Sequence, residues 1–155
     1  MKVKNFGLIA LASLLMIGCA KTTARAAWIP AKATTHLEDM ACILLDAAAA
    51  DDMQSYAIPR AYGSVNFSVA PKRTAVAEES FSLDAGDIVT LNCVYTPRTA
   101  SVDVGLVAPD GYFYYVNNTD GTFDESIEVS ERGTYTLAVR NNSSSTVSIT
   151  GSVNY

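Results

Sequence analysis

The sequence VDVGLVAPDGYFYYV, residues 102–116, predicts two antiparallel strands joined by a tight turn. Apolar residues occupy every second position before the turn, which is the period of a strand with one buried face. The turn is the tripeptide PDG at 109–111, with glycine where a three-residue hairpin loop requires a left-handed backbone. This loop sets the register of the hairpin, in which Leu106 pairs with Tyr114 and both face the core.

The same register identifies two candidate ligand-binding residues. Phe113 pairs with Val107 and Tyr115 pairs with Gly105, on the face opposite the core. We expect both rings to be exposed, with the missing side chain of Gly105 leaving a shallow gap beside Tyr115. An exposed aromatic surface offers a large contact area at low entropic cost, which suits a sugar or a peptide. The alternative is that a helix or another strand layer covers this face.

Short runs with the same two-residue period continue from residue 55 to the end of the chain. Turn signals rich in Gly, Asp and Asn separate these runs. Their alternating apolar residues are Val65, Phe67 and Val69; Phe81 and Leu83; Val89, Leu91 and Cys93; Tyr135, Leu137 and Val139; and Val147, Ile149 and Val153. This pattern predicts a mainly β domain over 55–155, a jelly-roll-like antiparallel β-sandwich of seven or eight strands.

A helical period precedes the sandwich. Thr35 and Glu38 have the spacing of a capping box, and apolar residues from Leu37 to Ala48 then recur three and four positions apart. We therefore predict one short helix over 36–52. Its apolar stripe would pack on the sandwich or, alternatively, bind a partner.

The first residues have the features of an export signal. Lys2 and Lys4 precede the apolar run Phe6–Ile17, which is too short to span a bilayer as a mature helix. The run ends at Gly18 and Cys19, and this junction resembles the lipobox of bacterial lipoproteins. That resemblance implies an exported protein whose cysteine carries a membrane anchor.

The resemblance sets the expected processing of the chain. We expect a signal peptide over 1–18, lipidation at Cys19 and a polar tether over 19–35. The alternative is simple secretion, because cleavage after Ala26 would also satisfy the usual small-residue rule. If Cys19 carries lipid, Cys42 and Cys93 are left as a pair that could form a disulfide or remain as thiols.

The negative net charge of the chain argues against nucleic acid as a partner. The chain has 155 residues and a formal net charge of −5, and its length allows one domain with an N-terminal appendage. From residue 61 onward there are five basic and eleven acidic residues. Binding to nucleic acid depends on Lys and Arg neutralising phosphates, so this composition argues against it.

The motifs indicate no catalytic site and no cofactor. The single histidine, His36, precedes the sandwich, away from any nucleophile motif. Asp124, Glu125 and Glu128 leave a carboxylate-based hydrolase as an alternative. Turn aspartates could bind calcium or simply stabilise their own turns, and they are Asp84, Asp87, Asp110, Asp120 and Asp124.

Three stretches carry a family resemblance: FSLDAGDIVTL at 81–91, VDVGL at 102–106 leading into the PDG turn, and GTYTLAV at 133–139. Through them, residues 79–154 resemble bacterial pre-peptidase C-terminal-type domains. Those domains are jelly-roll sandwiches appended to secreted enzymes, and some bind calcium or polysaccharide. The chain as a whole is similar to small exported proteins of gut Firmicutes.

Together these features predict a non-enzymatic, lipid-anchored protein of the cell envelope. Its expected role is binding or adhesion through Phe113 and Tyr115, toward polysaccharide or an envelope protein. A second hypothesis is an accessory or structural subunit of an envelope complex.

Overall fold

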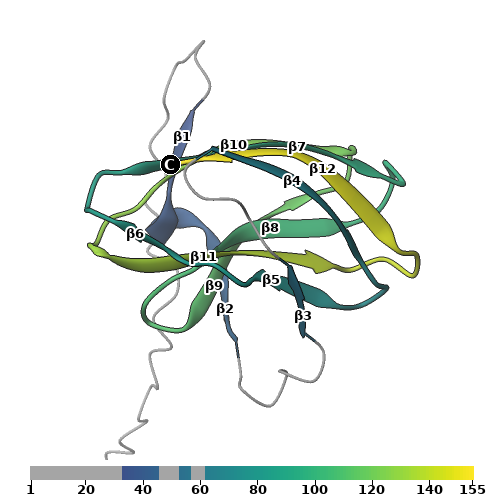
Figure 1. The fold of residues 1–155 in the computed structure, drawn as a ribbon, viewed down its shortest axis with the longest axis horizontal. Coiled ribbons are helices and arrows are strands. Elements are labelled where there is room, and N and C mark those ends of the chain that lie inside the picture. The colour runs from purple at the N-terminus through teal and green to yellow at the C-terminus, as the bar shows by residue number, and fades with distance from the viewer. Residues whose placement is uncertain (1–32, 46–52, 57–61) are drawn as a thin grey trace, which may run out of the picture.

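The computed structural model describes residues 33–45, 53–56 and 62–155, which form two packed β-sheets (Figure 1). The strands of the first sheet, in spatial order, are β1 (Thr34–His36), β10 (Thr122–Glu128), β7 (Ile88–Thr96), β12 (Val147–Asn154) and β4 (Tyr62–Val69). The strands of the second are β2 (Ala41–Leu44), β9 (Tyr112–Asn118), β8 (Val102–Val107), β11 (Gly133–Asn141), β5 (Thr74–Ala77) and β3 (Met53–Tyr56), with β6 (Phe81–Leu83) also paired to β11. The predicted β-sandwich is confirmed.

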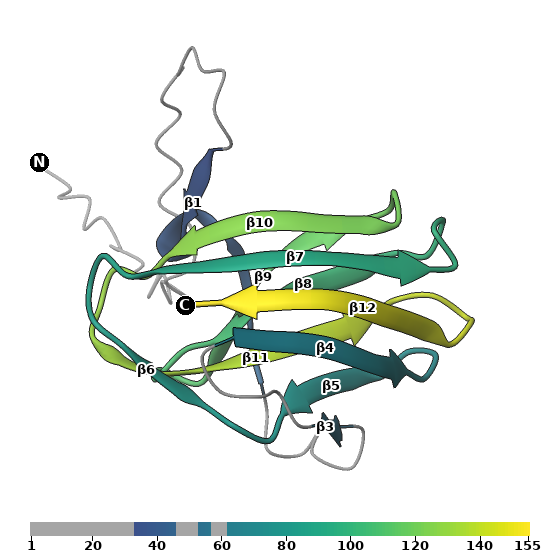
Figure 2. The same ribbon diagram turned by 45° about the horizontal axis from the view of Figure 1, so that its top comes forward.

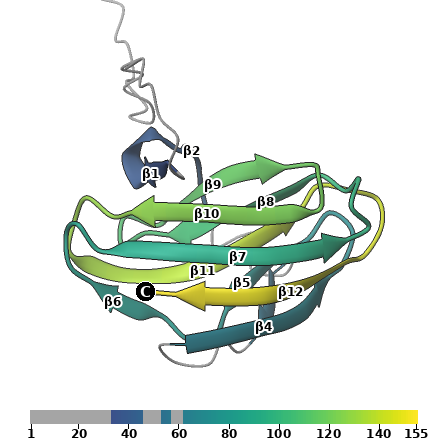
Figure 3. The same cartoon turned by 90° about the horizontal axis from the view of Figure 1, so that it is seen from above.

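Figure 3 shows the strands of the first sheet lying over those of the second. The inward-facing side chains of alternating strands form the core between the two sheets. Tyr95 and Phe123 are almost completely buried there, and their rings stack with centroids 4.9 Å apart. The hydroxyl of Tyr95 donates to the carbonyl of Ala100 at 3.1 Å, and that of Tyr135 donates to the carbonyl of Glu131 at 2.8 Å. The buried tyrosines therefore contribute apolar area without leaving a polar group unsatisfied.

The hairpin of β8 and β9 has the predicted register. Leu106 pairs with Tyr114, and the amide of Ala108 donates to the carbonyl of Tyr112 at 2.9 Å. Gly111 has a φ of +84°, the left-handed conformation that the three-residue loop requires. Leu106 is fully buried, and Tyr114 packs against the core, so the inward face is also as predicted.

The predicted helix over 36–52 is wrong in the part of that segment that the structure describes. Leu37–Asp39 form a single 3₁₀ turn, η1, and strand β2 follows it. Leu37 and Met40 are three residues apart and both buried. A single 3₁₀ turn therefore produces the same spacing of buried residues that indicated a helix. Pairing of β2 with β9 then overrides the helical propensity of the following residues. Residues 46–52 lie outside the described segments.

The sheets also contain more strands than the seven or eight predicted. Strand β10 was missed because Asp124, Glu125 and Glu128 interrupt its apolar alternation, and β5 was missed because it has only four residues. Two pairings, β1 with β10 and β3 with β5, are parallel. The sandwich is therefore mixed at its margins, while its central strands are antiparallel as predicted.

The N-terminal predictions fall mostly outside the described residues. The signal peptide over 1–18 and Cys19 belong to that part of the chain. Strand β1 begins at Thr34, so the last residues of the predicted tether over 19–35 belong to the sheet. Within the described segments, no helix has the length and hydropathy needed to cross a membrane.

Candidate functional site

The prediction that Phe113 is exposed is wrong, because its side chain is 0% exposed. The residue does lie on the outer face of the second sheet, where Val107 pairs with it on one side. Strand β2 lies on its other side and places Ile43 opposite it. Residues directly opposite in a sheet have neighbouring side chains, so the unpredicted strand supplies an apolar neighbour for this ring.

Tyr115 is half-buried, and groups from two directions contact its ring. The Phe113 ring stacks on it with centroids 5.3 Å apart and an interplanar angle of 28°. The guanidinium carbon of Arg140 lies 4.8 Å from the Tyr115 centroid. Through Asp103, Arg140 is level with Asn117 in the sheet, which is two residues after Tyr115 on β9. Phe113 is two residues before Tyr115 on the same strand. The ring is therefore held between an aromatic and a cation, and a sugar would have no free face to stack on.

A buried carboxylate positions Arg140. Asp103 is 2% exposed, and one of its oxygens accepts bonds from Arg140 Nη2 at 2.6 Å and Nε at 2.7 Å. Asn142 Nδ2 donates to the same oxygen at 2.7 Å, and Asn117 Nδ2 donates to the other at 2.6 Å. These bonds satisfy the Asp103 charge, and they direct the guanidinium over the ring of Tyr115.

Gly105 does not leave the shallow gap that the sequence predicted. A Cβ at this position would collide with the backbone carbonyl of Tyr114, so strand β9 itself fills the space. The close approach of the two backbones requires glycine here. Because Gly105 has no side chain, Arg140 can still reach the ring of Tyr115 across β8.

The structure reveals a second candidate site at one end of the sandwich. A shallow cavity of about 190 Å³ lies between η1, the β8–β9 turn and the loop from β10 to β11. Its described lining residues are Leu37, Glu38, Ala108, Pro109, Asp110, Tyr114, Ser130, Glu131 and Tyr135. Three of them are acidic and none is basic. We call this cavity the acidic end pocket.

Two tyrosines that line the acidic end pocket have raised pKa values. Burial raises the pKa of Tyr114 to about 12, and the 2.7 Å hydrogen bond that its hydroxyl donates to Asp110 adds to the shift. Burial also raises the pKa of Tyr135, with further contributions from the charges of Glu131 and Asp110. The smaller part of each pKa shift comes from the nearby carboxylates, and the negative potential of these carboxylates favours a cation in the same place.

The carboxylates considered for hydrolysis do not form a pair. Asp124 and Glu128 face outward on β10 and Glu125 faces the other way, since side chains alternate along a strand. Asp124 accepts a hydrogen bond from Asn92 at 3.3 Å, and Glu128 lies 3.6 Å from His36 Nδ1 on β1. The sheet register thus separates the two outward carboxylates along β10.

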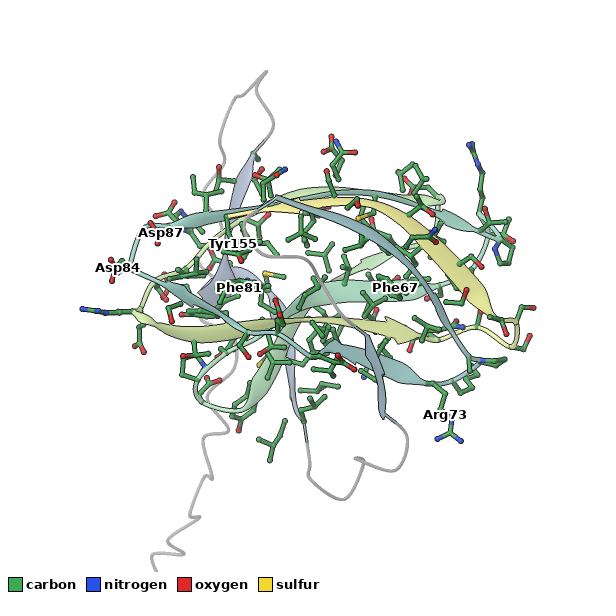
Figure 4. All side chains as sticks on the ribbon, viewed as in Figure 1. Phe67, Arg73, Phe81, Asp84, Asp87 and Tyr155 are labelled. Carbon is green, nitrogen blue, oxygen red and sulfur yellow. The ribbon has the colours of Figure 1, made fainter. Side chains whose placement is uncertain are left out.

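Three of the aspartates considered for calcium stabilise their own turns, whereas Asp124 lies on strand β10 and the Asp84 carboxylate pairs with Arg132. Asp87 accepts a bond from the amide of Asp84 at 2.8 Å in one turn (Figure 4). Asp110 accepts from the amide of Tyr112 at 2.9 Å, and Asp120 accepts from the amide of Thr122 at 3.1 Å. Across the described segments, no three His, Cys, Asp or Glu side chains come together as metal ligands.

Cys42 and Cys93 do not form the disulfide that the sequence allowed. Cys93 is a buried free thiol on β7, and burial raises its pKa to about 11. Cys42 lies on β2 in the other sheet. A thiol with so high a pKa is protonated at neutral pH and packs as a small apolar side chain.

No family model and no curated protein matches the chain. Among solved structures, the fold is similar to the crystal structure of Aeromonas hydrophila PliG, a periplasmic lysozyme inhibitor of g-type lysozyme. The two chains are 15% identical, with a TM-score of 0.47, and the match covers 66% of this chain and 96% of that one.

Replacing Arg140 with Met should destabilise the fold by about 3–5 kcal/mol, because the buried Asp103 carboxylate would lose its cationic partner. Urea unfolding followed by circular dichroism measures the change. Arg132→Met is the matched control, since Arg132 pairs with Asp84 at 3.1 Å in an exposed position and should contribute little. Equal losses in the two variants would contradict a special role for the Asp103–Arg140 pair.

Tyr114 should titrate near pH 12 in the folded protein, as measured by phenolate absorbance and assigned by comparison with Tyr114→Phe. Asp110→Asn should lower this pKa, because the carboxylate stabilises the protonated phenol. The raised pKa stabilises the fold below the ordinary tyrosine value of 10.0, and this contribution is lost as the pH rises toward 12. Glu78→Gln is the control, because it removes one exposed negative charge away from Tyr114 and should leave the Tyr114 pKa unchanged. An equally unchanged Tyr114 pKa in Asp110→Asn would contradict this interpretation.

Proposed function

We propose that the chain is an exported, non-catalytic binding protein that is lipidated at Cys19 and binds a basic protein partner. The observation that carries this proposal is the acidic end pocket, which combines three carboxylates with apolar walls. Export and lipidation rest on the N-terminal sequence, with its basic start, short apolar run and terminal cysteine.

The pocket has the chemistry needed to bind a lysine or arginine side chain. Leu37, Ala108 and Pro109 offer apolar surface for the methylene stem of such a residue. Glu38 and Glu131 offer carboxylates for the cationic head, together with Asp110. The ring of Tyr114, which is only partly buried, can also attract a cation through its face. One side chain of a partner protein would therefore meet both an apolar and an acidic lining.

The charge of the whole chain favours the same class of partner. The formal net charge is −5, and acidic residues outnumber basic ones by eleven to five from residue 61 onward. A negative field of this kind accelerates encounter with a positively charged protein and repels an acidic one. The long-range and local electrostatics therefore favour a basic partner.

Polysaccharide is less well supported as the ligand. Phe113 is buried, and both faces of the Tyr115 ring are in contact with other side chains. The aromatic residues predicted as a platform therefore belong to the scaffold of the second sheet.

The pocket is tested with a fluorescent lysine-rich peptide and the same peptide acetylated on its lysines, using anisotropy. We expect binding of the unmodified peptide only. Glu38→Gln/Glu131→Gln should weaken binding by about tenfold or more, because close charge pairs at an interface are lost. Its structural effect should be small, since the Glu131 bond to Tyr135 uses the backbone carbonyl.

The matched control is Asp39→Asn/Glu78→Gln, which removes the same two negative charges at exposed positions that do not line the pocket. Equal weakening in both double variants would show that only net charge matters and would overturn the pocket assignment. Retention of the wild-type chain on insoluble polysaccharide or peptidoglycan, lost in Tyr115→Ala, would instead favour a glycan ligand.

Lipidation is tested separately by partitioning of the expressed chain between detergent and aqueous phases. The wild-type chain should enter the detergent phase, and Cys19→Ala should move it to the aqueous phase because the acyl anchor cannot form. Unchanged partitioning in Cys19→Ala would exclude lipidation at this residue.

A further inference from the structure

Strand β4 is the last strand of the five-stranded sheet (Figure 2). Its eight residues pair with β12 in unbroken register, from Tyr62 opposite Asn154 to Val69 opposite Val147. No other described strand pairs with its opposite side. An edge strand presents unpaired backbone N–H and C=O groups on such a side, and these groups are complementary to another extended chain.

In the described part of the chain, this edge has none of the features that usually protect an edge strand. The other terminal strands of the two sheets, β1, β2 and β3, have three or four residues each, which limits pairing with another molecule. Strand β4 is twice the length of β2, and its sequence YGSVNFSV contains no lysine, no proline and no charged residue. Its unbroken register with β12 excludes a bulge.

The two strands at this edge carry no charged side chain, unlike the chain as a whole, and the turn after β4 adds the basic Lys72 and Arg73. The outward side chains of β4 are the small, exposed Ser64, Asn66 and Ser68. Two acidic chains repel each other over most of their surfaces, so an edge of uncharged strands is where two copies can approach with the least electrostatic cost.

We propose that two copies of this chain associate by antiparallel pairing of their β4 strands, which joins the two five-stranded sheets into one. Such a contact uses the same patch on both copies, as two-fold symmetry requires. Centred on Asn66, it places Ser64 of one copy opposite Ser68 of the other. The hydroxyls of Ser68 and Ser148 already lie 3.0 Å apart across β4 and β12, so this face accommodates paired serines.

Sedimentation velocity over a range of concentrations tests the proposal on a chain that begins at residue 20, which retains every described residue. The wild-type chain should reach twice the monomer mass as concentration rises. Asn66→Lys should remain monomeric, because it places like charges at the centre of the contact and supplies the edge protection that β4 lacks. Asn66 is exposed, so the folded monomer should tolerate the change.

Thr150→Lys is the matched control. Thr150 is exposed directly opposite Asn66, one strand further from the edge, and should leave the dimer intact. A wild-type chain that stays monomeric, or equal effects of the two lysines, would overturn the proposal.

Hydrogen exchange gives a second measurement. The backbone amides of β4 that point away from β12 should become more protected from exchange as the protein concentration rises. Full protection at all concentrations in a chain that sediments as a monomer would mean that a segment of the same chain occupies the edge, and this would also overturn the proposal.

Discussion

The outer face of the second sheet depends on one buried charge, the carboxylate of Asp103. Its hydrogen bonds connect β8 to β9 through Asn117 and to β11 through Arg140. A bond from Asn142 adds the start of the loop after β11. Leaving this carboxylate without its partners would be costly, so the three strands and the loop are held in one arrangement. The position of Arg140, and hence that of Tyr115, follows from this constraint.

The same constraint explains why the predicted aromatic platform is not a stacking surface. Arg140 must turn toward Asp103, and its guanidinium then lies over the ring of Tyr115. Gly105 permits this because no side chain stands between them. A feature that looks like a ligand platform in the hairpin sequence therefore becomes part of the scaffold. The acidic end pocket, built from loops and η1, remains as the surface whose polar groups face outward.

Much of the sandwich could be predicted from sequence, because local rules dominate in the central strands. The PDG turn and the alternation before it gave the β8–β9 register correctly to the residue pair. The turn at Leu37–Asp39 could not be predicted, because one 3₁₀ turn and the start of a helix share the same spacing of buried residues. Strand β10 was hidden for a different reason, since its acidic residues lower β-propensity although Phe123 and Ile127 are buried.

The acidic end pocket was beyond sequence reasoning for a topological reason. Glu38, Asp110 and Glu131 come from three segments far apart in the chain, and Glu38 was assigned to a helix cap. Asp110 had an ordinary explanation as a turn residue, and no sequence motif singled out Glu131. These three carboxylates line one pocket only because the fold brings η1, the β8–β9 turn and the β10–β11 loop together. Phe113 was misplaced for a related reason, because the partner strand β2 was not anticipated.

The two proposed surfaces are compatible with each other because of the strand order. Strand β1 is at one edge of the five-stranded sheet and β4 is at the other, with three strands between them. The turn η1, which lines the acidic end pocket, follows β1 directly in the chain. Pairing through β4 would therefore leave both pockets of a dimer accessible. Two weak sites held in one assembly would bind a partner with repeated basic segments more tightly than either site alone, because the second contact becomes intramolecular. A pocket of this size, suited to one side chain, would gain most from such an arrangement.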